Sequence, residues 1–189
     1  MGTVERVFVA GAGGEAMRPV EAVQAVAGRG LDGDRYAIRR GYWTDVDECQ
    51  VTLIQGEDLD AISGGSRRLC QGDTPCPPGT ASSGVAVQDG QHRRNIVTRG
   101  VDLRALAGRT FRIGEATFAY DRPRPPCRYI ESITEPGMTR SLAARRGGIC
   151  VRVVGSGVVR TGDEIELLPV EEGFEPLRPG PIHRVPNKA

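Results

Sequence analysis

The chain has 189 residues, of which 39% are hydrophobic and 26% charged, and its formal net charge is +1. This length and balance are typical of one globular domain, and a net charge so near zero gives no indication of a nucleic-acid partner. No apolar run approaches the roughly 20 residues of a membrane span, and the N-terminus carries Glu5 and no small-residue cleavage site, so we expect a cytoplasmic protein without membrane contact.

Short runs rich in Val, Ile, Phe and Thr recur along the chain, are broken by glycines and predict strands. In chain order these runs are 4–10, 20–28, 50–54, 94–98, 110–114, 116–120, 148–154, 157–162 and 163–168. Three helices are also predicted, at 56–63, 102–108 and 137–148. The close spacing of the strands predicts a mainly β fold, a barrel or a sandwich, with a few short helices.

The first strand runs into VFVAGAGGEA, which fits the dinucleotide-binding pattern G-x-G-x-x-G/A through Gly11, Gly13 and Ala16. That pattern requires a helix whose N-terminus holds the pyrophosphate. Pro19 would interrupt such a helix, and another strand-like run begins at Val20. We therefore interpret these glycines as a loop between two strands.

Two stretches are irregular. Residues 64–92 are packed with Gly, Pro and Ser, which predicts a long surface loop or insertion. Cys70 and Cys76 within it could pair or bind a metal, although a mobile polar loop is the simpler interpretation. Residues 169–189 are proline-rich, so we expect one domain over 1–168 followed by an extended C-terminal tail.

Two polar motifs precede or follow predicted strands. In GLDGDRYA, residues 30–37, Asp34 and Arg35 come directly after a glycine turn. In HRRNIV, residues 92–97, strand alternation predicts Arg93 and Asn95 on one face and Arg94 on the other. A guanidinium and an amide on the same face can together bind phosphate or the edge of a heterocycle, so we expect Arg93 to matter more than Arg94.

The stretch RPRPPCRYI, residues 122–130, surrounds Cys127 with three prolines and three arginines. The prolines predict a rigid extended turn and not a helix, and the arginines favour a thiolate, which acts as a nucleophile or a metal ligand. Cys49 and Cys150 instead flank strand-like runs and are predicted to be small buried hydrophobic residues. His92 is the only histidine before the tail, and Lys188 the only lysine, so pyridoxal phosphate bound as a Schiff base is not expected.

The order of these motifs resembles the MOSC domain, the family named for the C-terminal part of molybdenum cofactor sulfurases. The resemblance rests on GDRYA, on VTLI followed by QGEDL, and on RRNIVTRGVDLRALAGRTFRIGEA, PPCRYI and GGICVRVVGSGVVRTGDEIEL. It runs from about residue 4 to residue 168. The chain is similar to the small stand-alone bacterial type, which has no aminotransferase-like domain.

The resemblance implies a MOSC-type β-barrel and a set of site residues. Cys127 matches the family cysteine, which ligates the molybdenum of a pterin cofactor (molybdopterin) in amidoxime-reducing proteins and handles sulfur in the sulfurases. Arg93 and Asn95 match the family's Arg-x-Asn, which contacts the cofactor, with Arg94 between them. Asp34 and Arg35 belong to the family's GDR turn. The cofactor is an anionic phosphate ester, and Arg124 and Arg128 beside the cysteine would help to offset its charge.

Three functions remain open from the sequence. The chain could be a molybdenum-cofactor oxidoreductase that reduces small N-hydroxylated or related substrates. It would then need a separate electron-donor protein, because no flavin, iron–sulfur or haem motif is present. Alternatively, Cys127 could carry sulfur or cofactor from a donor protein to an acceptor without turnover. Finally, the domain could be a cofactor-free binding module.

Overall fold

The computed structural model describes residues 2–42, 49–63, 85, 87, 89–143 and 145–169. Of the predicted loop at 64–92, only Val85, Val87 and 89–92 fall within this set. Val85 is buried against the helical side of the protein, so this end of the segment is packed. Cys70, Cys76 and the predicted tail beyond residue 169 lie outside the described residues.

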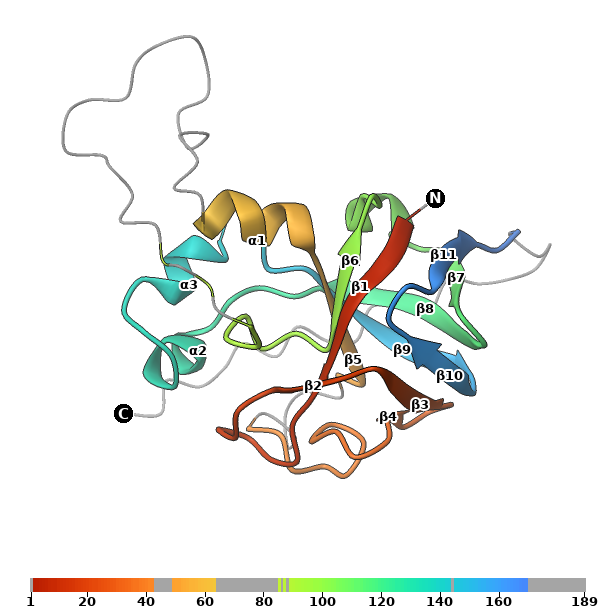
Figure 1. The fold of residues 1–189 in the computed structure, drawn as a ribbon, viewed down its shortest axis with the longest axis horizontal. Helices are drawn as coiled ribbons and strands as arrows, with labels where there is room; N and C mark the ends of the chain where they lie inside the picture. The colour runs from red at the N-terminus through yellow and green to blue at the C-terminus, as the bar shows by residue number, and fades with distance from the viewer. Residues whose placement is uncertain are drawn as a thin grey trace, which may run out of the picture.

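Seven strands form a closed barrel, as the sequence predicted (Figure 1). Their order around the barrel is β11-β7-β8-β9-β5-β6-β1, and pairing of β1 with β11 closes it. β5 and β6 are parallel, and each other neighbouring pair is antiparallel. The strands are β1 (Gly2–Val9), β5 (Val51–Gln55), β6 (Ile96–Arg99), β7 (Thr110–Ile113), β8 (Ala116–Pro123), β9 (Ile149–Gly155) and β11 (Glu164–Leu167).

Four further strands are short: β10 (Gly157–Arg160) falls within the predicted run 157–162, whereas β4 (Gly30–Leu31) was not predicted and β2 (Arg18–Val20) begins before the predicted run 20–28. β2 pairs with β1 at the end of the large sheet. Such an edge position tolerates Pro19, which has no N–H to donate. The run predicted at 20–28 is divided between β2 and β3 (Ala22–Val26), and β3 forms a second sheet with β4 and β10. The predicted loop between two strands at the early glycines is confirmed.

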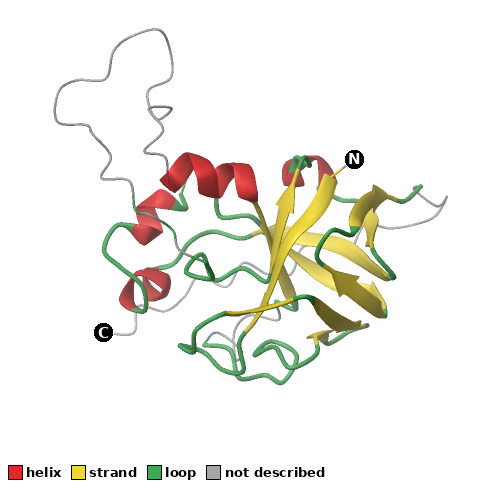
Figure 2. Cartoon of the chain, viewed as in Figure 1, coloured by secondary structure: helices red, strands yellow, loops and turns green. Residues whose placement is uncertain are grey.

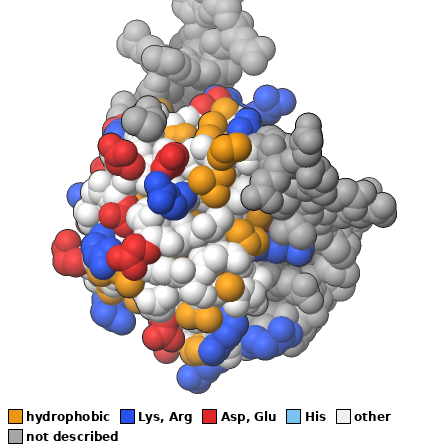
Figure 3. Space-filling model, turned by 90° about the vertical axis from the view of Figure 1, so that its right-hand side faces the viewer, with side chains coloured by type: hydrophobic (Ala, Val, Ile, Leu, Met, Phe, Trp, Pro, Cys, Tyr) orange, Lys and Arg blue, Asp and Glu red, His pale blue; other side chains and the backbone are white. Residues whose placement is uncertain are grey.

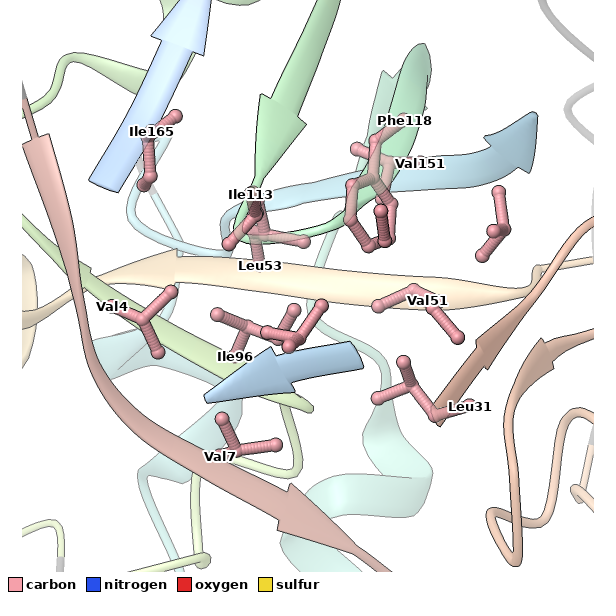
Figure 4. Close-up of a cluster of buried hydrophobic side chains, with 14 of the residues drawn as sticks. Val4, Val7, Leu31, Val51, Leu53, Ile96, Ile113, Phe118, Val151 and Ile165 are labelled. Atoms are coloured by element: carbon pink, nitrogen blue, oxygen red, sulfur yellow. The ribbon is translucent and has the colours of Figure 1, made fainter. Parts of the chain in front are cut away.

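The barrel interior holds the main hydrophobic core. In β7, Phe111 and Ile113 are buried while Arg112 between them is exposed, so the strand alternates as a half-buried strand should. Figure 4 shows side chains from different strands converging inside the barrel. Those labelled there are Val4, Val7, Leu31, Val51, Leu53, Ile96, Ile113, Phe118, Val151 and Ile165.

The helices are short and lie outside the barrel (Figure 2). They are α1 (Gly56–Ser63), the 3₁₀ helix η1 (Leu103–Leu106), α2 (Arg128–Ser132) and α3 (Met138–Ser141). A second hydrophobic cluster joins α2 and α3 to the outer face of the barrel through Phe8, Ile54, Ile130 and Met138. This cluster fixes the position of the chain around Cys127.

Two helix predictions differ from the structure. The helix predicted at 137–148 ends at Ser141, and the turn that follows contains Arg145 and Gly148 with φ of +70° and +81°, which no residue inside an α-helix adopts. The stretch 122–130 was predicted to avoid helix, yet α2 begins at Arg128. By contrast, the helix predicted at 56–63 is confirmed, and the one predicted at 102–108 appears as the shorter 3₁₀ helix η1, where Asp102 accepts from the Arg104 N–H as the N-cap.

The exterior is mixed in charge where it can be seen. On the face shown in Figure 3, basic and acidic side chains are intermingled rather than grouped by sign. Within the described ranges, no helix has the length and apolar character that crossing a membrane requires.

Candidate functional site

Four separate segments enclose a pocket beside the barrel. They are the β1–β2 loop, the turn after β4, the residues before β6, and the connection from β8 into α2. The pocket is lined by Gly13, Arg35, Tyr36, Tyr42, Arg93, Arg94, Arg124, Pro125, Pro126, Cys127, Tyr129 and Ile130. This lining contains four arginines and a thiol but no carboxylate, so the pocket suits an anion.

Arg94 is as deeply buried as Arg35, with 4% of its surface exposed. Its Nε donates to the Gly147 carbonyl at 2.7 Å, and its Nη1 donates to the His92 carbonyl at 3.0 Å. Its Nη2 is buried and has no hydrogen-bond partner among the described residues. Burial, and then the charge of Arg124, lower the pKa of Arg94 to about 10, so it stays protonated at neutral pH.

Arg93 reaches the pocket through an unusual backbone conformation. Its φ is +60°, and its N–H donates to the Gly90 carbonyl in a turn that ends before β6 begins at Ile96. Its guanidinium donates to the Glu15 carbonyl in the β1–β2 loop. Burial, and then the charge of Arg35, lower the pKa of Arg93.

The predicted alternation of Arg93, Arg94 and Asn95 is therefore wrong. Strand alternation does not apply in a turn, so Arg93 and Arg94 line the same pocket while Asn95 is not among the lining residues.

Asn95 is instead a fully buried structural junction. Its Oδ1 accepts from the Thr52 hydroxyl and N–H, at 2.8 and 3.2 Å. Its Nδ2 donates to the Phe8 carbonyl at 3.2 Å and to Asp34 Oδ2 at 2.9 Å. It thus ties β1, β5 and the Asp34 turn together behind the pocket.

Asp34 and Arg35 form a buried ion pair in which only Arg35 lines the pocket. Asp34 is fully buried and accepts from the Arg35 guanidinium and the Ala10 N–H, each at 3.1 Å, so it lies behind the pocket and outside its lining. Arg35 lines the pocket, and its Nη2 donates to the Arg93 carbonyl at 3.2 Å. A charge held by so many fixed contacts is preorganised for a ligand.

Cys127 is partly exposed and lies at the N-cap position of α2, where its thiol makes no capping hydrogen bond. The Thr139 hydroxyl donates to its backbone carbonyl at 3.2 Å, which fixes the backbone and leaves the thiol facing the pocket. Arg124 also lines the pocket, and its Nη2 donates to the Tyr36 hydroxyl at 3.3 Å. Arg128, predicted to join it, is exposed and is not part of the lining.

His92 does not line the pocket. It is buried, its ring meets Phe8 edge-on at 5.3 Å, and its Nδ1 accepts from the Arg94 N–H at 3.0 Å. Burial, and then the charges of Arg94, Arg6 and Arg93, lower the pKa of His92 to about 3. The ring is therefore neutral at physiological pH and positions Arg94 instead of exchanging protons with a ligand.

One side of the pocket is an aromatic wall that was not predicted from the sequence. Tyr42 and Tyr129 stack with their ring centroids 3.7 Å apart and their planes 15° from parallel, and Tyr36 lies under the Arg35 guanidinium at 4.5 Å. All three tyrosines line the pocket. They stand far apart in the sequence without a shared spacing, so only the fold brings them together.

Within the part of the chain that the structure describes, no metal cage built from protein side chains alone accompanies the thiol. Among the described ranges, no group of three or more His, Cys, Asp or Glu side chains could hold a metal ion.

Comparison with known proteins agrees with this architecture. The family model described as the MOSC domain matches residues 41–166. No curated protein sequence shows a significant match.

Several solved structures share the fold at low sequence identity. The YuaD protein from Bacillus subtilis superposes with a TM-score of 0.63 and 19% identity, covering 88% of this chain and 96% of that one. YiiM from Geobacillus stearothermophilus gives 0.61 and 14%, covering 89% and 76%. YiiM from Escherichia coli gives 0.58 and 18%, covering 89% and 70%.

Proposed function

The chain belongs to the MOSC domain family, whose model matches residues 41–166 of its 189, and from this we propose that its pocket binds the molybdenum cofactor with Cys127 as the protein ligand to molybdenum. The observation that carries the proposal is one pocket lined by four arginines and a partly exposed thiol. The family is associated with this cofactor, and the chemistry of the lining suits it.

The residues of the pocket fit such a group in two respects. A phosphate ester needs cationic donors, and the buried Nη2 of Arg94 has no partner among the described residues, so a donor is available that an anion would satisfy. Molybdenum prefers soft sulfur ligands, and Cys127 offers the thiol that lines this pocket. Arg35, Arg93, Arg94 and Arg124 would hold the anionic part.

The reaction we propose is reduction of small N-hydroxylated or related substrates. Converting N–OH to N–H consumes two electrons and two protons and releases water, and the bound cofactor supplies the two-electron chemistry. A separate donor protein provides the electrons. The chain's own residues bind and orient the cofactor. The arginines hold its anionic part, and the prolines before Cys127 limit the movement of this cysteine. The tyrosines form one wall of the pocket.

A sulfur or cofactor carrier is the second candidate. It is favoured by the thiol of Cys127, which makes no capping hydrogen bond and is partly exposed, as a persulfide carrier requires. In that case Cys127 would accept sulfane sulfur from a donor protein and pass it on without turnover.

Metal and sulfur content distinguish the two candidates. The protein is expressed anaerobically with molybdate, and its molybdenum is measured together with the intact mass. About one molybdenum per chain supports cofactor binding, whereas a mass increase of one sulfur on Cys127 without metal supports the carrier. A chain that carries neither under these conditions contradicts both.

The matched variant is Cys127→Ala. We expect it to lose metal or sulfur while its thermal unfolding midpoint stays within a few degrees of the parent's, because Cys127 is partly exposed and its thiol forms no cap. Full loading of this variant would show that Cys127 is not the ligand.

A further inference from the structure

Two other thiols meet in the interior. Cys49 and Cys150 are separated by 101 positions in the chain, yet their Sγ atoms lie 3.2 Å apart. Both are buried, with 4% and 0% of their surfaces exposed, as the sequence predicted. Nothing in the spacing of the two cysteines predicts that they touch.

The two cysteines differ in how firmly the backbone holds them. Cys150 lies in β9 and is paired on both sides, opposite Thr52 of β5 and Arg122 of β8. Cys49 precedes β5, which begins at Val51, so it lies outside the strand ladder. A disulfide requires an S–S distance of about 2.05 Å, so Cys49 needs to move only about 1 Å toward Cys150.

We propose that Cys49 and Cys150 form a reversible disulfide, a redox-sensitive modification site separate from Cys127. Hydrogen peroxide is a sufficient oxidant. Two S–H bonds break and one S–S bond forms, while peroxide takes up the two electrons and two protons and leaves as two molecules of water. A low-molecular-weight disulfide acts equally by exchange and leaves as two thiols.

The bond would form beside backbone that serves the pocket. Gly147 and Gly148 immediately precede Ile149 and Cys150 in the chain. The Gly147 carbonyl accepts from Arg94 Nε at 2.7 Å, and the Gly148 carbonyl accepts from the Arg124 N–H at 2.9 Å. Oxidation therefore fixes β9 close to the carbonyls that hold two of the pocket arginines.

The test uses the full chain and peptide mapping. The protein is treated with hydrogen peroxide or oxidised glutathione, alkylated under denaturing conditions and digested. We expect a peptide that joins Cys49 to Cys150. Because the bond closes a loop of about 100 residues, the thermal unfolding midpoint should rise by on the order of 5–15 °C and return after dithiothreitol.

Three variants make the test decisive. Cys49→Ala and Cys150→Ala should each abolish the linked peptide and the rise in midpoint, whereas Cys127→Ala should keep both. The linked peptide in the unaltered chain supports the proposal even if a variant folds poorly. Oxidation that yields sulfinic acid at these cysteines, or peptides linked through another cysteine, would overturn it, and so would a linked peptide that dithiothreitol does not release.

Discussion

At the scale of single residues, the pocket depends on side chains that are held in place although not all of their hydrogen-bond donors have a partner among the described residues. Arg94 is fixed at Nε and Nη1 by the carbonyls of Gly147 and His92, while its Nη2 has no partner among the described residues. A buried donor without a partner costs free energy, and an anion that accepts from it recovers that cost.

Replacement of Arg94 by Met should therefore weaken anion binding. Losing one charge-assisted hydrogen bond costs about 1.5–3 kcal/mol, which corresponds to a roughly tenfold to hundredfold weaker affinity for inorganic phosphate. Isothermal titration calorimetry at fixed ionic strength measures this change. The matched control is Arg128→Met, which removes the same charge from an exposed position outside the lining and should leave the affinity nearly unchanged. Equal losses in both variants would show that only net charge matters.

His92 should make the fold sensitive to acid. Its pKa is about 3 in the folded state, against 6.5 as the ordinary value, so the unfolded chain binds the proton more tightly. The stability that neutral His92 contributes is complete above pH 6.5 and is lost as the pH falls toward 3. Between pH 7 and pH 4.5 this loss amounts to roughly 2–3 kcal/mol.

The variant His92→Asn tests this, because its amide oxygen can still accept from the Arg94 N–H while nothing titrates. Chemical denaturation at the two pH values should give a smaller loss of unfolding free energy in the variant than in the parent. An identical loss in both would assign the acid sensitivity to other groups.

The sequence predicted which residues lie near the site better than it predicted what each of them does there. The sequence placed Cys127, Arg35, Arg93 and Arg124 near one site, and all four line the pocket. It misjudged Asn95, because the positive φ of Arg93 that ends the turn leaves no trace in the pattern of residue types.

At the scale of secondary structure elements, the chain passes close to β5 at Gly148, just before β9 begins. An added Cβ at Gly148 would lie 1.9 Å from the Leu53 carbonyl oxygen, and the residue has a φ of +81°. The backbone must therefore shift at the junction of β9 with β5, which is where Arg94 and Arg124 are anchored.

Gly148→Ala should destabilise the fold by at least about 3 kcal/mol, since it combines backbone strain with a clash against main-chain atoms. Gly162→Ala is the control: its φ is +91°, but nothing lies within 4 Å of the added carbon, so only the conformational cost of about 1 kcal/mol applies. Urea denaturation of both variants measures the difference. Equal destabilisation would mean that the close approach to Leu53 is unimportant.

The sequence predicted strands better than their limits or the short helices. Long apolar runs such as 50–54 and 148–154 appear as β5 and β9 nearly as expected. β4 has only two residues, too few for a periodic signal. α2 was missed because prolines dominate the segment before it, although they end at Pro126 and leave Arg128–Ser132 free to form a helix.

At the scale of the whole molecule, the barrel is closed by the pairing of its first strand with its last. Gly2 and Thr3 of β1 lie opposite Ile165 and Glu164 of β11. Ile165 is 4% exposed and belongs to the barrel core, so the closure is held by packing as well as by the ladder.

Ile165→Ala should cost about 2–4 kcal/mol of unfolding free energy, because it removes buried methyl groups at this seam. Amide hydrogen exchange should increase in β11 and at the start of β1. Glu166→Ala on the same strand is the control, since its ion pair with Arg112 is exposed and contributes at most about 1 kcal/mol. Faster exchange confined to β11 would show that β1 stays ordered without its partner.

The same closure has a consequence for biosynthesis. Because β11 spans Glu164–Leu167, the barrel cannot close until nearly all of the described chain has left the ribosome, and until then the first two residues of β1 lack their partner strand. An unpaired strand edge invites pairing with neighbouring nascent chains. The folding yield in the cell should therefore depend on how quickly β11 is synthesised. It should also depend on chaperones that cover the unpaired edge of β1 until β11 is complete.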